Sequence, residues 1–433
     1  MKNDDSIGYW SAVAIGIGGM VGGGIFAVLG LAVELARGGT PVAFALAGAV
    51  AMVTSYSYAK MSVAYPSQGG TVEFLNQVFG PGLITGGLNI LLWLSYIIVL
   101  SLYAYTFGSY GASFFPESMQ PVVKHIFISG AVILLTLLNI LSAKIVGESE
   151  EFIVAVKIII LLVFIGFGIG SVDLSKLGPS TWTAPLNIIT GGMIIFVAYE
   201  GFELIANTAG DIRNPKKTLP AAYYTAVGFV ILLYIVVAVV TVGNLPLEQI
   251  IKYKDYALAA AAKPFLGMFG FTMIGIAALL STGSAINATL YGASRFSYII
   301  AKDGELPKAL EKKTWNRPLE GLFITSGLTL VIANLFDLSS IATMGSAGFL
   351  IVFGMVNAAN ARAAKKTGSL RWLSLVGLFL CIFALGALIW QRATTNLVEV
   401  WVLVVMVGLA FIIEWLYRRV TGRKLRHFGL KRY

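Results

Sequence analysis

Long apolar segments follow one another along almost the whole chain, and they constrain the fold more than any other feature. Of the 433 residues, 57% are hydrophobic and 12% are charged, whereas an average soluble protein has roughly 45–50% and about 25%. A helix that crosses a bilayer needs about 20 mainly apolar residues, so this composition suffices for roughly twelve crossings. We therefore expect an all-α integral membrane protein whose residues 1–433 form a single domain within the lipid bilayer.

Twelve apolar runs, each bounded by charged residues, proline or glycine, mark the expected transmembrane helices. The runs lie near 8–36, 41–65, 82–110, 122–141, 147–170, 185–210, 220–243, 268–300, 319–335, 340–361, 371–390 and 397–417.

Basic residues are distributed unevenly between the two sides that these crossings define. Most of the 31 lysines and arginines fall on the side of the N-terminus, and the opposite side holds only Arg37, Lys124, Lys176, Lys252, Lys254, Lys263 and Arg392. An excess of positive charge marks the cytoplasmic face of a membrane protein. We therefore expect a multi-pass protein of the cell membrane with both termini in the cytoplasm, and no nucleic-acid partner.

Lys157 belongs to neither side. It lies about ten residues into the fifth run, roughly 15 Å from the cytoplasmic end of that helix, which is too deep for its side chain to reach the surface. Its charge must be satisfied inside the protein. A permanent internal salt bridge to Glu200 or Glu203 is one way to do so, and a role in coupling is the other. Either glutamate is an alternative carrier of the coupled proton.

Six glycines cluster within nine residues of the first apolar run, at positions 16, 18, 19, 22, 23 and 24. Each glycine costs up to about 1 kcal/mol in a helix relative to alanine, so this stretch is expected to unwind. Unwound backbone is tolerated in a bilayer only where protein or a water-filled cavity supplies hydrogen-bond partners. The run is therefore a candidate binding site. Close helix packing through Gly18 and Gly22 is the alternative.

The sixth run places Glu200 and Glu203 about midway along residues 185–210. Acidic residues at that depth usually have a function. Alternatively, the crossing ends near Tyr199 and both glutamates are interfacial.

Unwound first and sixth crossings predict an inverted repeat of five helices plus five, with the ligand held between the two breaks at mid-membrane. The repeats cover about 8–170 and 185–361, and two extra helices follow at about 371–417. Amides at the half-helix that begins near Gly23 suit a carboxylate, and carbonyls freed at both breaks suit a cation. A site with both is typical of a zwitterion, most commonly an α-amino acid.

On these residues the chain resembles the amino acid, polyamine and organocation (APC) transporter superfamily, and within it the proton-coupled amino acid transporters. Residues 22–26 (GGGIF) fit the family's G-[SAG]-G-I-F element, residues 196–203 (FVAYEGFE) fit the broken sixth helix, and residues 214–220 (NPKKTLP) fit the loop N-P-x-[KR]-x-x-P. The resemblance implies that a substrate carboxylate binds the amides of Gly22, Gly23 and Gly24. It implies that the substrate ammonium meets carbonyls among Met20, Val21, Phe196, Ala198 and Glu200.

The resemblance also implies how transport is coupled. Sodium-dependent relatives hold an ion between the first and eighth helices, where this chain would place the ammonium of Lys157 near the carbonyl of Gly18 and the hydroxyls of Ser281 and Thr282. Protons, with no metal or other cofactor, are then the expected coupling ion. If one conformation supplies acceptors to Lys157 and the other removes them, protonation and helix position become linked equilibria. The expected activity is proton-coupled import of α-amino acids of broad specificity by alternating access.

Other classes of function fit less well. Amino acid exchange, or transport of cationic amino acids or polyamines, is the main alternative, because Glu200 is available to a cationic side chain. An ion channel would need a repeated pore loop or a charged ring. An enzyme is not expected, because the two histidines fall in or beside polar connections and no HExxH, Walker or G-x-S-x-G element occurs.

Overall fold

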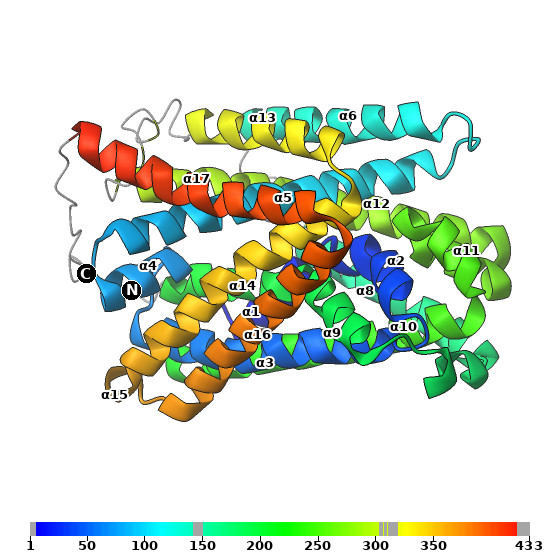
Figure 1. Ribbon diagram of the computed structural model, residues 1–433, viewed down its shortest axis with the longest axis horizontal. Helices are drawn as coiled ribbons and strands as arrows, with labels where there is room; N and C mark the ends of the chain where they lie inside the picture. The colour runs from blue at the N-terminus through cyan, green and yellow to red at the C-terminus, as the bar shows by residue number, and fades with distance from the viewer. Residues whose placement is uncertain (1–5, 142–149, 303–305, 307–309, 311–318, 422–433) are drawn as a thin grey trace.

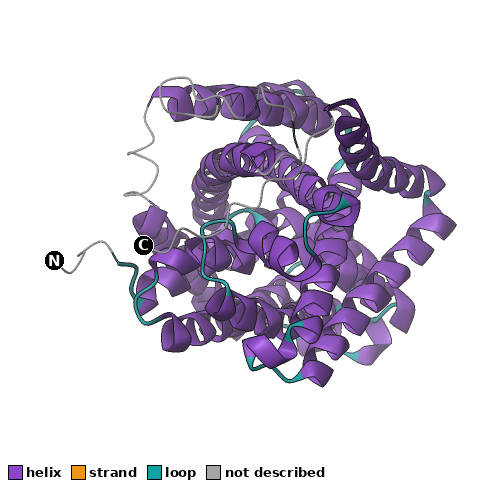
Figure 2. Ribbon diagram, turned by 90° about the vertical axis from the view of Figure 1, so that its left-hand side faces the viewer, coloured by secondary structure: helices purple, strands orange, loops and turns teal. Residues whose placement is uncertain are grey.

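The computed structural model describes residues 6–141, 150–302, 306, 310 and 319–421. Within these ranges the chain is helical almost throughout and has no β-strand, only two isolated β-bridges. Figure 2 shows helices in every part of the molecule and loops only between them. The expected all-α membrane fold is confirmed.

The helices of the first half follow the predicted runs. They are α1 (Tyr9–Met20), α2 (Gly24–Ala36), α3 (Thr40–Ala64), α4 (Gly70–Phe79), α5 (Leu83–Ala112), α6 (Gln120–Leu141) and α8 (Glu150–Gly168). Three short 3₁₀ turns then connect the halves, namely η1 (Ile169–Ser171), η2 (Leu174–Leu177) and η3 (Pro179–Thr181).

The second half begins with α9 (Pro185–Ile194), which continues directly into the 3₁₀-helix η4 (Ile195–Asp211). The remaining elements are α10 (Pro215–Asn244), α11 (Leu247–Lys252), η5 (Lys254–Tyr256), α12 (Ala257–Lys302), α13 (Leu319–Leu335), α14 (Leu338–Arg362), α15 (Ala364–Thr367), α16 (Arg371–Thr395) and α17 (Leu397–Thr421). The predicted run 268–300 begins where α12 kinks, at Gly267, whose φ of 60° lies in the region that favours glycine.

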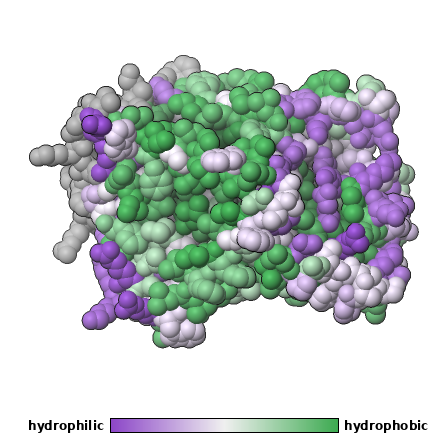
Figure 3. Space-filling model, viewed as in Figure 1, coloured by the Kyte–Doolittle hydropathy of each residue, from purple (hydrophilic) through white to green (hydrophobic). Residues whose placement is uncertain are grey.

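Ten helices in the described ranges are long and apolar enough to cross a membrane, and α1 with α2 forms an eleventh, bent crossing. The remaining predicted run, 319–335, coincides with α13, which at 17 residues is shorter than a typical crossing. The count of twelve therefore stays a prediction. Figure 3 shows apolar side chains over the middle of the molecule and hydrophilic ones towards its two ends.

Burial separates inner from outer helices. The buried share of the most apolar stretch is 83% in α5 and 89% in Pro185–Asp211, but only 28% in α6 and in α16. The inner layer surrounds α1, which packs against η4 and α10, while α5 packs against α12. Long helices lie side by side in Figure 1, with α2 and α11 at the end far from the chain termini.

The predicted orientation rests partly on residues outside the described ranges. These include the start of the fifth run at 147 and the basic residues Lys2, Lys144, Lys308, Lys312, Lys313, Arg317 and those of the tail after 421. The cytoplasmic placement of both termini and the inverted repeat therefore stay predictions.

Candidate functional site

The first crossing is divided within its glycine run. Helix α1 ends at Met20, residues 21–23 form a turn, and α2 starts at Gly24 with its axis bent by 44° from that of α1. The division falls on the residues that the sequence predicts.

The sixth crossing differs from the prediction. Residues 196–203 were expected to be unwound, but they belong to η4, a 3₁₀-helix that runs from Ile195 to Asp211. A 3₁₀-helix keeps its backbone groups bonded to residues three positions away, whereas an unwound segment leaves them bare in an apolar interior at a cost of several kcal/mol each. The sixth crossing therefore changes pitch.

The pitch of η4 sorts its side chains onto three faces, because residues three apart align in a 3₁₀-helix. Gly201 and Leu204 face Gly19 of α1, and Ala198 faces Gly24 of α2. Tyr199 and Phe202 pack their rings near those of Tyr234 and Tyr223 on α10. Glu200 and Glu203 form the third face, so both carboxylates project to the same side.

The first and sixth crossings meet backbone to backbone. A Cβ atom added to Gly201 would lie 2.2 Å from the carbonyl carbon of Gly19, and one added to Gly24 would lie 2.8 Å from Cα of Ala198. No side chain larger than hydrogen fits between Gly19 and Gly201. Close packing, the alternative explanation for the glycine run, therefore explains Gly19 and Gly24. The same run also contains the turn at residues 21–23.

Three side chains from other crossings hydrogen-bond the carbonyls around the turn. Lys157 of α8, 2% exposed, donates to the oxygen of Gly18 over 3.0 Å. Ser281 of α12 donates to the oxygen of Val21 over 2.8 Å and also contacts that of Gly22. Thr282 instead donates to Ala278 of its own helix.

The third side chain that hydrogen-bonds the carbonyls around the turn is Tyr234 of α10. Its hydroxyl donates to the carbonyl oxygen of Met20 over 2.6 Å and lies 3.3 Å from that of Ala198. Both carbonyls were candidates for the substrate ammonium. Sequence reasoning missed Tyr234, and the only available signal was a tyrosine in the middle of an apolar crossing, where its hydroxyl needs a partner.

Side chains pack closely against the glycines whose amides are predicted to hold a carboxylate. A Cβ atom on Gly23 would lie 2.2 Å from the ring of Tyr103, and one on Gly22 would lie 3.0 Å from Cβ of Ala285. Phe196 packs its ring against that of Phe353.

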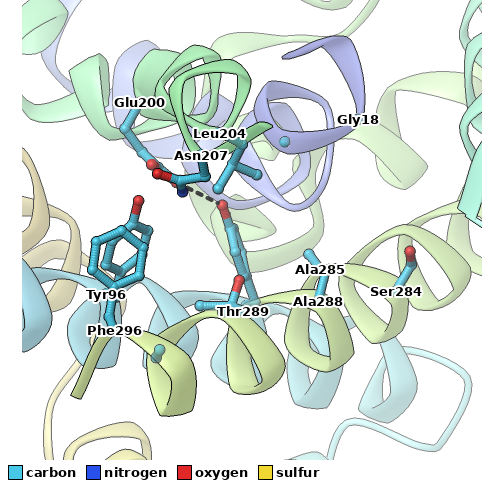
Figure 4. Close-up of a pocket in the computed structure, with 14 residues that line it drawn as sticks. Gly18, Tyr96, Glu200, Leu204, Asn207, Ser284, Ala285, Ala288, Thr289 and Phe296 are labelled. Carbon is cyan, nitrogen blue, oxygen red and sulfur yellow. Dashed lines mark hydrogen bonds between the residues drawn. The ribbon is translucent and has the colours of Figure 1, made fainter. Parts of the chain in front are cut away.

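A cavity lies between α1, α5, η4 and α12 (Figure 4). Its walls are Gly18, Gly19, Tyr96, Tyr103, Glu200, Leu204, Asn207, Ser284, Ala285, Ala288, Thr289, Gly292, Ala293 and Phe296. Of the predicted site residues, the cavity therefore includes Gly18 and Glu200. Its α12 wall runs towards the end of that helix at Lys302.

The only carboxyl group among the described wall residues of this cavity is that of Glu200. Glu200, 4% exposed, accepts a hydrogen bond from Tyr103 through Oε1 over 3.1 Å, and its Oε2 has no hydrogen-bond partner among the described residues. Within the same ranges, Oδ1 of Asn207 and the hydroxyl of Tyr96 also lack one. No described wall residue is lysine, arginine or histidine. The cavity therefore suits a cationic group.

Glu203 lies one turn further along η4 and is fully buried. Its Oε1 accepts a hydrogen bond from Thr71, whose hydroxyl also pairs with that of Tyr58 over 2.8 Å. Glu203 does not line the cavity. In the part of the chain that the structure describes, no three His, Cys, Asp or Glu side chains come together as a metal site.

Comparison with known proteins identifies the family. Residues 7–412 match the sequence pattern of the family described as amino acid permease. The chain belongs to the amino acid permease family. This permease is 36% identical over 433 residues to an uncharacterized protein of Methanocaldococcus jannaschii, covering 98% of this chain and 97% of the relative.

Two further relatives have names that describe transport. The permease is 36% identical over 350 residues to the inner membrane transport protein YbaT of Escherichia coli, covering 80% of this chain and 81% of YbaT. It is 27% identical over 373 residues to the methylthioribose transporter of Bacillus subtilis, covering 81% and 79%. The family and these names confirm that the permease is a membrane transporter and not an enzyme.

Proposed function

We propose that this permease is a proton-coupled symporter that imports α-amino acids across the cell membrane by alternating access. The observation that carries the proposal is the contact between Lys157 and the carbonyl of Gly18 beside the turn in the first crossing. A buried ammonium that is bonded to the moving part of a binding site links its own charge to the position of that part.

The substrate zwitterion would be held at its two ends. The amides of Gly22, Gly23 and Gly24 lie at the start of α2, where free N–H groups attract a carboxylate. The ammonium would pair with the Glu200 side chain, because Oε2 lies at the cavity wall with no described hydrogen-bond partner. In this proposal the carboxylate of Glu200 takes the role that the family resemblance assigns to backbone carbonyls, since Tyr234 engages those of Met20 and Ala198.

The coupling step would follow from the acceptors of Lys157. When α1 holds the Gly18 carbonyl against Lys157, the protonated amine is stabilised by a charge-assisted hydrogen bond. When α1 moves away, burial disfavours the charged amine and the proton leaves. Because the two equilibria are linked, a proton gradient drives the change in access.

The described conformation is consistent with access from the cytoplasm. The central cavity extends along residues 284–296 of α12 towards the end that also carries the start of α1, the predicted cytoplasmic end. On the other side, Tyr103 covers Gly23. Import would require the Tyr103 side to open in a second conformation.

A second candidate is transport of cationic amino acids. It is favoured by the acceptors in the cavity, Glu200, Asn207 and Tyr96, which would also accept a side-chain ammonium. Uptake of neutral, acidic and basic amino acids into proteoliposomes, with and without an inward proton gradient, tests both candidates. Proton-driven uptake of neutral amino acids supports symport of broad specificity, and uptake of basic amino acids alone supports the second candidate. An uptake rate that is the same with and without the proton gradient contradicts symport.

A further inference from the structure

A second cavity lies at the opposite, predicted outer end of α5, and nothing in the proposed mechanism uses it. Its walls come from the end of α5 and the connection that follows it, from the start of α6, and from η5; they are Ser109, Ala112, Glu117, Gln120, Pro121, Lys124, His125, Asp255 and Tyr256. It shares no wall residue with the central cavity. It is therefore a separate site. Asp255 and Tyr256 in its wall belong to residues 247–256, which we call the outer cap.

Lys124 and Asp255 form an ion pair in the wall of this outer cavity. Nζ of Lys124 lies 3.7 Å from Oδ2 of Asp255, which exceeds the roughly 2.7–2.9 Å of a charge-assisted hydrogen bond. The hydroxyl of Tyr105 stands between them, accepting from Lys124 over 2.9 Å and donating to Asp255 over 3.1 Å. The ammonium has three donors and the carboxylate has further lone pairs, so each can bind another group.

A buried hydroxyl supplies the second, independent observation. Ser109 is 3% exposed, lines the cavity, and its Oγ has no hydrogen-bond partner among the described residues. Buried polar groups in proteins are nearly always hydrogen-bonded. Ser109 therefore indicates a polar occupant.

The charges define the class of that occupant. A simple anion would pair with Lys124 but be repelled by the carboxylates of Asp255 and Glu117, and a simple cation would pair with those carboxylates but be repelled by Lys124. A zwitterion satisfies both walls. We propose that the outer cavity binds a free α-amino acid, with its carboxylate at Lys124, its ammonium at Asp255 and Ser109 as a further hydrogen-bond partner. The choice of an amino acid among zwitterions rests on the proposed function.

Binding here would hold the outer cap in place. The cap is already tied to the rest of the molecule by ion pairs of Lys252 with Glu117 at 3.3 Å and of Lys254 with Glu34 at 3.0 Å. Lys124 of α6 already pairs with Asp255 of the cap at 3.7 Å, and a ligand that binds both side chains would strengthen this third link. Occupancy therefore favours the conformation that is closed on this side, and external amino acid at high concentration would slow reopening.

Protection of an engineered cysteine tests the site directly in the full-length protein. The native Cys381 is buried, so Gln120→Cys in the cavity wall reports the outer cavity, and Ser118→Cys on the exposed surface is the matched control. The measurement is the rate of labelling by a water-soluble maleimide in nanodiscs with L-alanine, propionate or ethylamine. At ten times its dissociation constant L-alanine leaves about one site in eleven empty, so labelling of Gln120→Cys slows about elevenfold.

The outcomes are distinct. The proposal expects that L-alanine protects Gln120→Cys from labelling, that propionate and ethylamine do not, and that Ser118→Cys is not protected. The protection of Gln120→Cys by L-alanine should persist when Glu200→Gln is added to weaken the central site. It should be lost when either Lys124→Met or Asp255→Asn is added. Equal protection by propionate or ethylamine, or loss of protection with Glu200→Gln, would overturn it. Protection by L-alanine in a protein that transports no amino acid would support the outer site and refute the proposed function instead.

Discussion

Gly19 and Gly201 touch through their backbones where the first and sixth crossings meet, and a Cβ atom on Gly201 would lie 2.2 Å from the carbonyl carbon of Gly19. This contact lets the two crossings pack with no side chain between them. Because the central cavity begins at Gly18 and Gly19 and continues past Glu200, the same contact sets the separation of the groups proposed to bind substrate.

We expect Gly201→Ala to abolish transport. The added methyl group meets backbone atoms, which cannot rotate away, so α1 and η4 must separate, and overpacking of this kind costs about 1–3 kcal/mol or more. Uptake into proteoliposomes and thermal unfolding measure the two effects. Gly228→Ala is the control, because its nearest neighbour is the flexible end of Met52 at 3.6 Å; wild-type behaviour of both variants would contradict the packing argument.

Tyr234→Phe removes the hydroxyl that joins the Met20 and Ala198 carbonyls. Leaving a buried acceptor unsatisfied costs about 1–3 kcal/mol, so we expect a lower unfolding temperature in detergent. The matched control is Tyr199→Phe, which removes a hydroxyl that donates to the carbonyl oxygen of Phe44 over 3.0 Å, away from the turn. The transport rate should fall only in Tyr234→Phe. An equal fall in the transport rate of both variants would show that the position of the hydroxyl is unimportant.

Glu200→Gln keeps the shape of the side chain and removes its charge. A hydrogen bond to a charged group contributes about 1.5–3 kcal/mol, so substrate affinity should fall roughly 10–100-fold. Equilibrium binding of radiolabelled substrate measures it. Glu203→Gln, one turn along the same face but outside the cavity, should bind substrate with affinity close to wild type; the reverse ranking would assign the ammonium to Glu203.

The sequence predicts the crossings and the location of the first break well, because apolar length and a glycine run are local signals. The 3₁₀ pitch of the sixth crossing was not predictable, since residues 196–203 carry the same carboxylates and glycine whether the backbone unwinds or tightens. The residues that this segment packs against, Gly19 and Gly24, are far away in sequence.

Side-chain contacts with backbone carbonyls were even harder to predict from the sequence. Lys157 attracts attention because it is a charge in an apolar run, and its hydrogen bond to Gly18 lies where the family resemblance places it. Tyr234 gives no such signal, because its role depends on which carbonyls face it. Thr282 illustrates the converse, since a hydroxyl in a helix can be satisfied by its own backbone, here by Ala278.

The most direct test of proton coupling is uptake by Lys157→Ala in proteoliposomes. We predict that an inward proton gradient no longer drives accumulation, because the variant lacks the amine that bonds to Gly18, while counterflow of substrate between equal pools, which needs no net proton movement, continues. Lys157→Arg, which keeps the charge but does not release its proton, should likewise lose gradient-driven accumulation. Full gradient-driven uptake by Lys157→Ala would contradict the account.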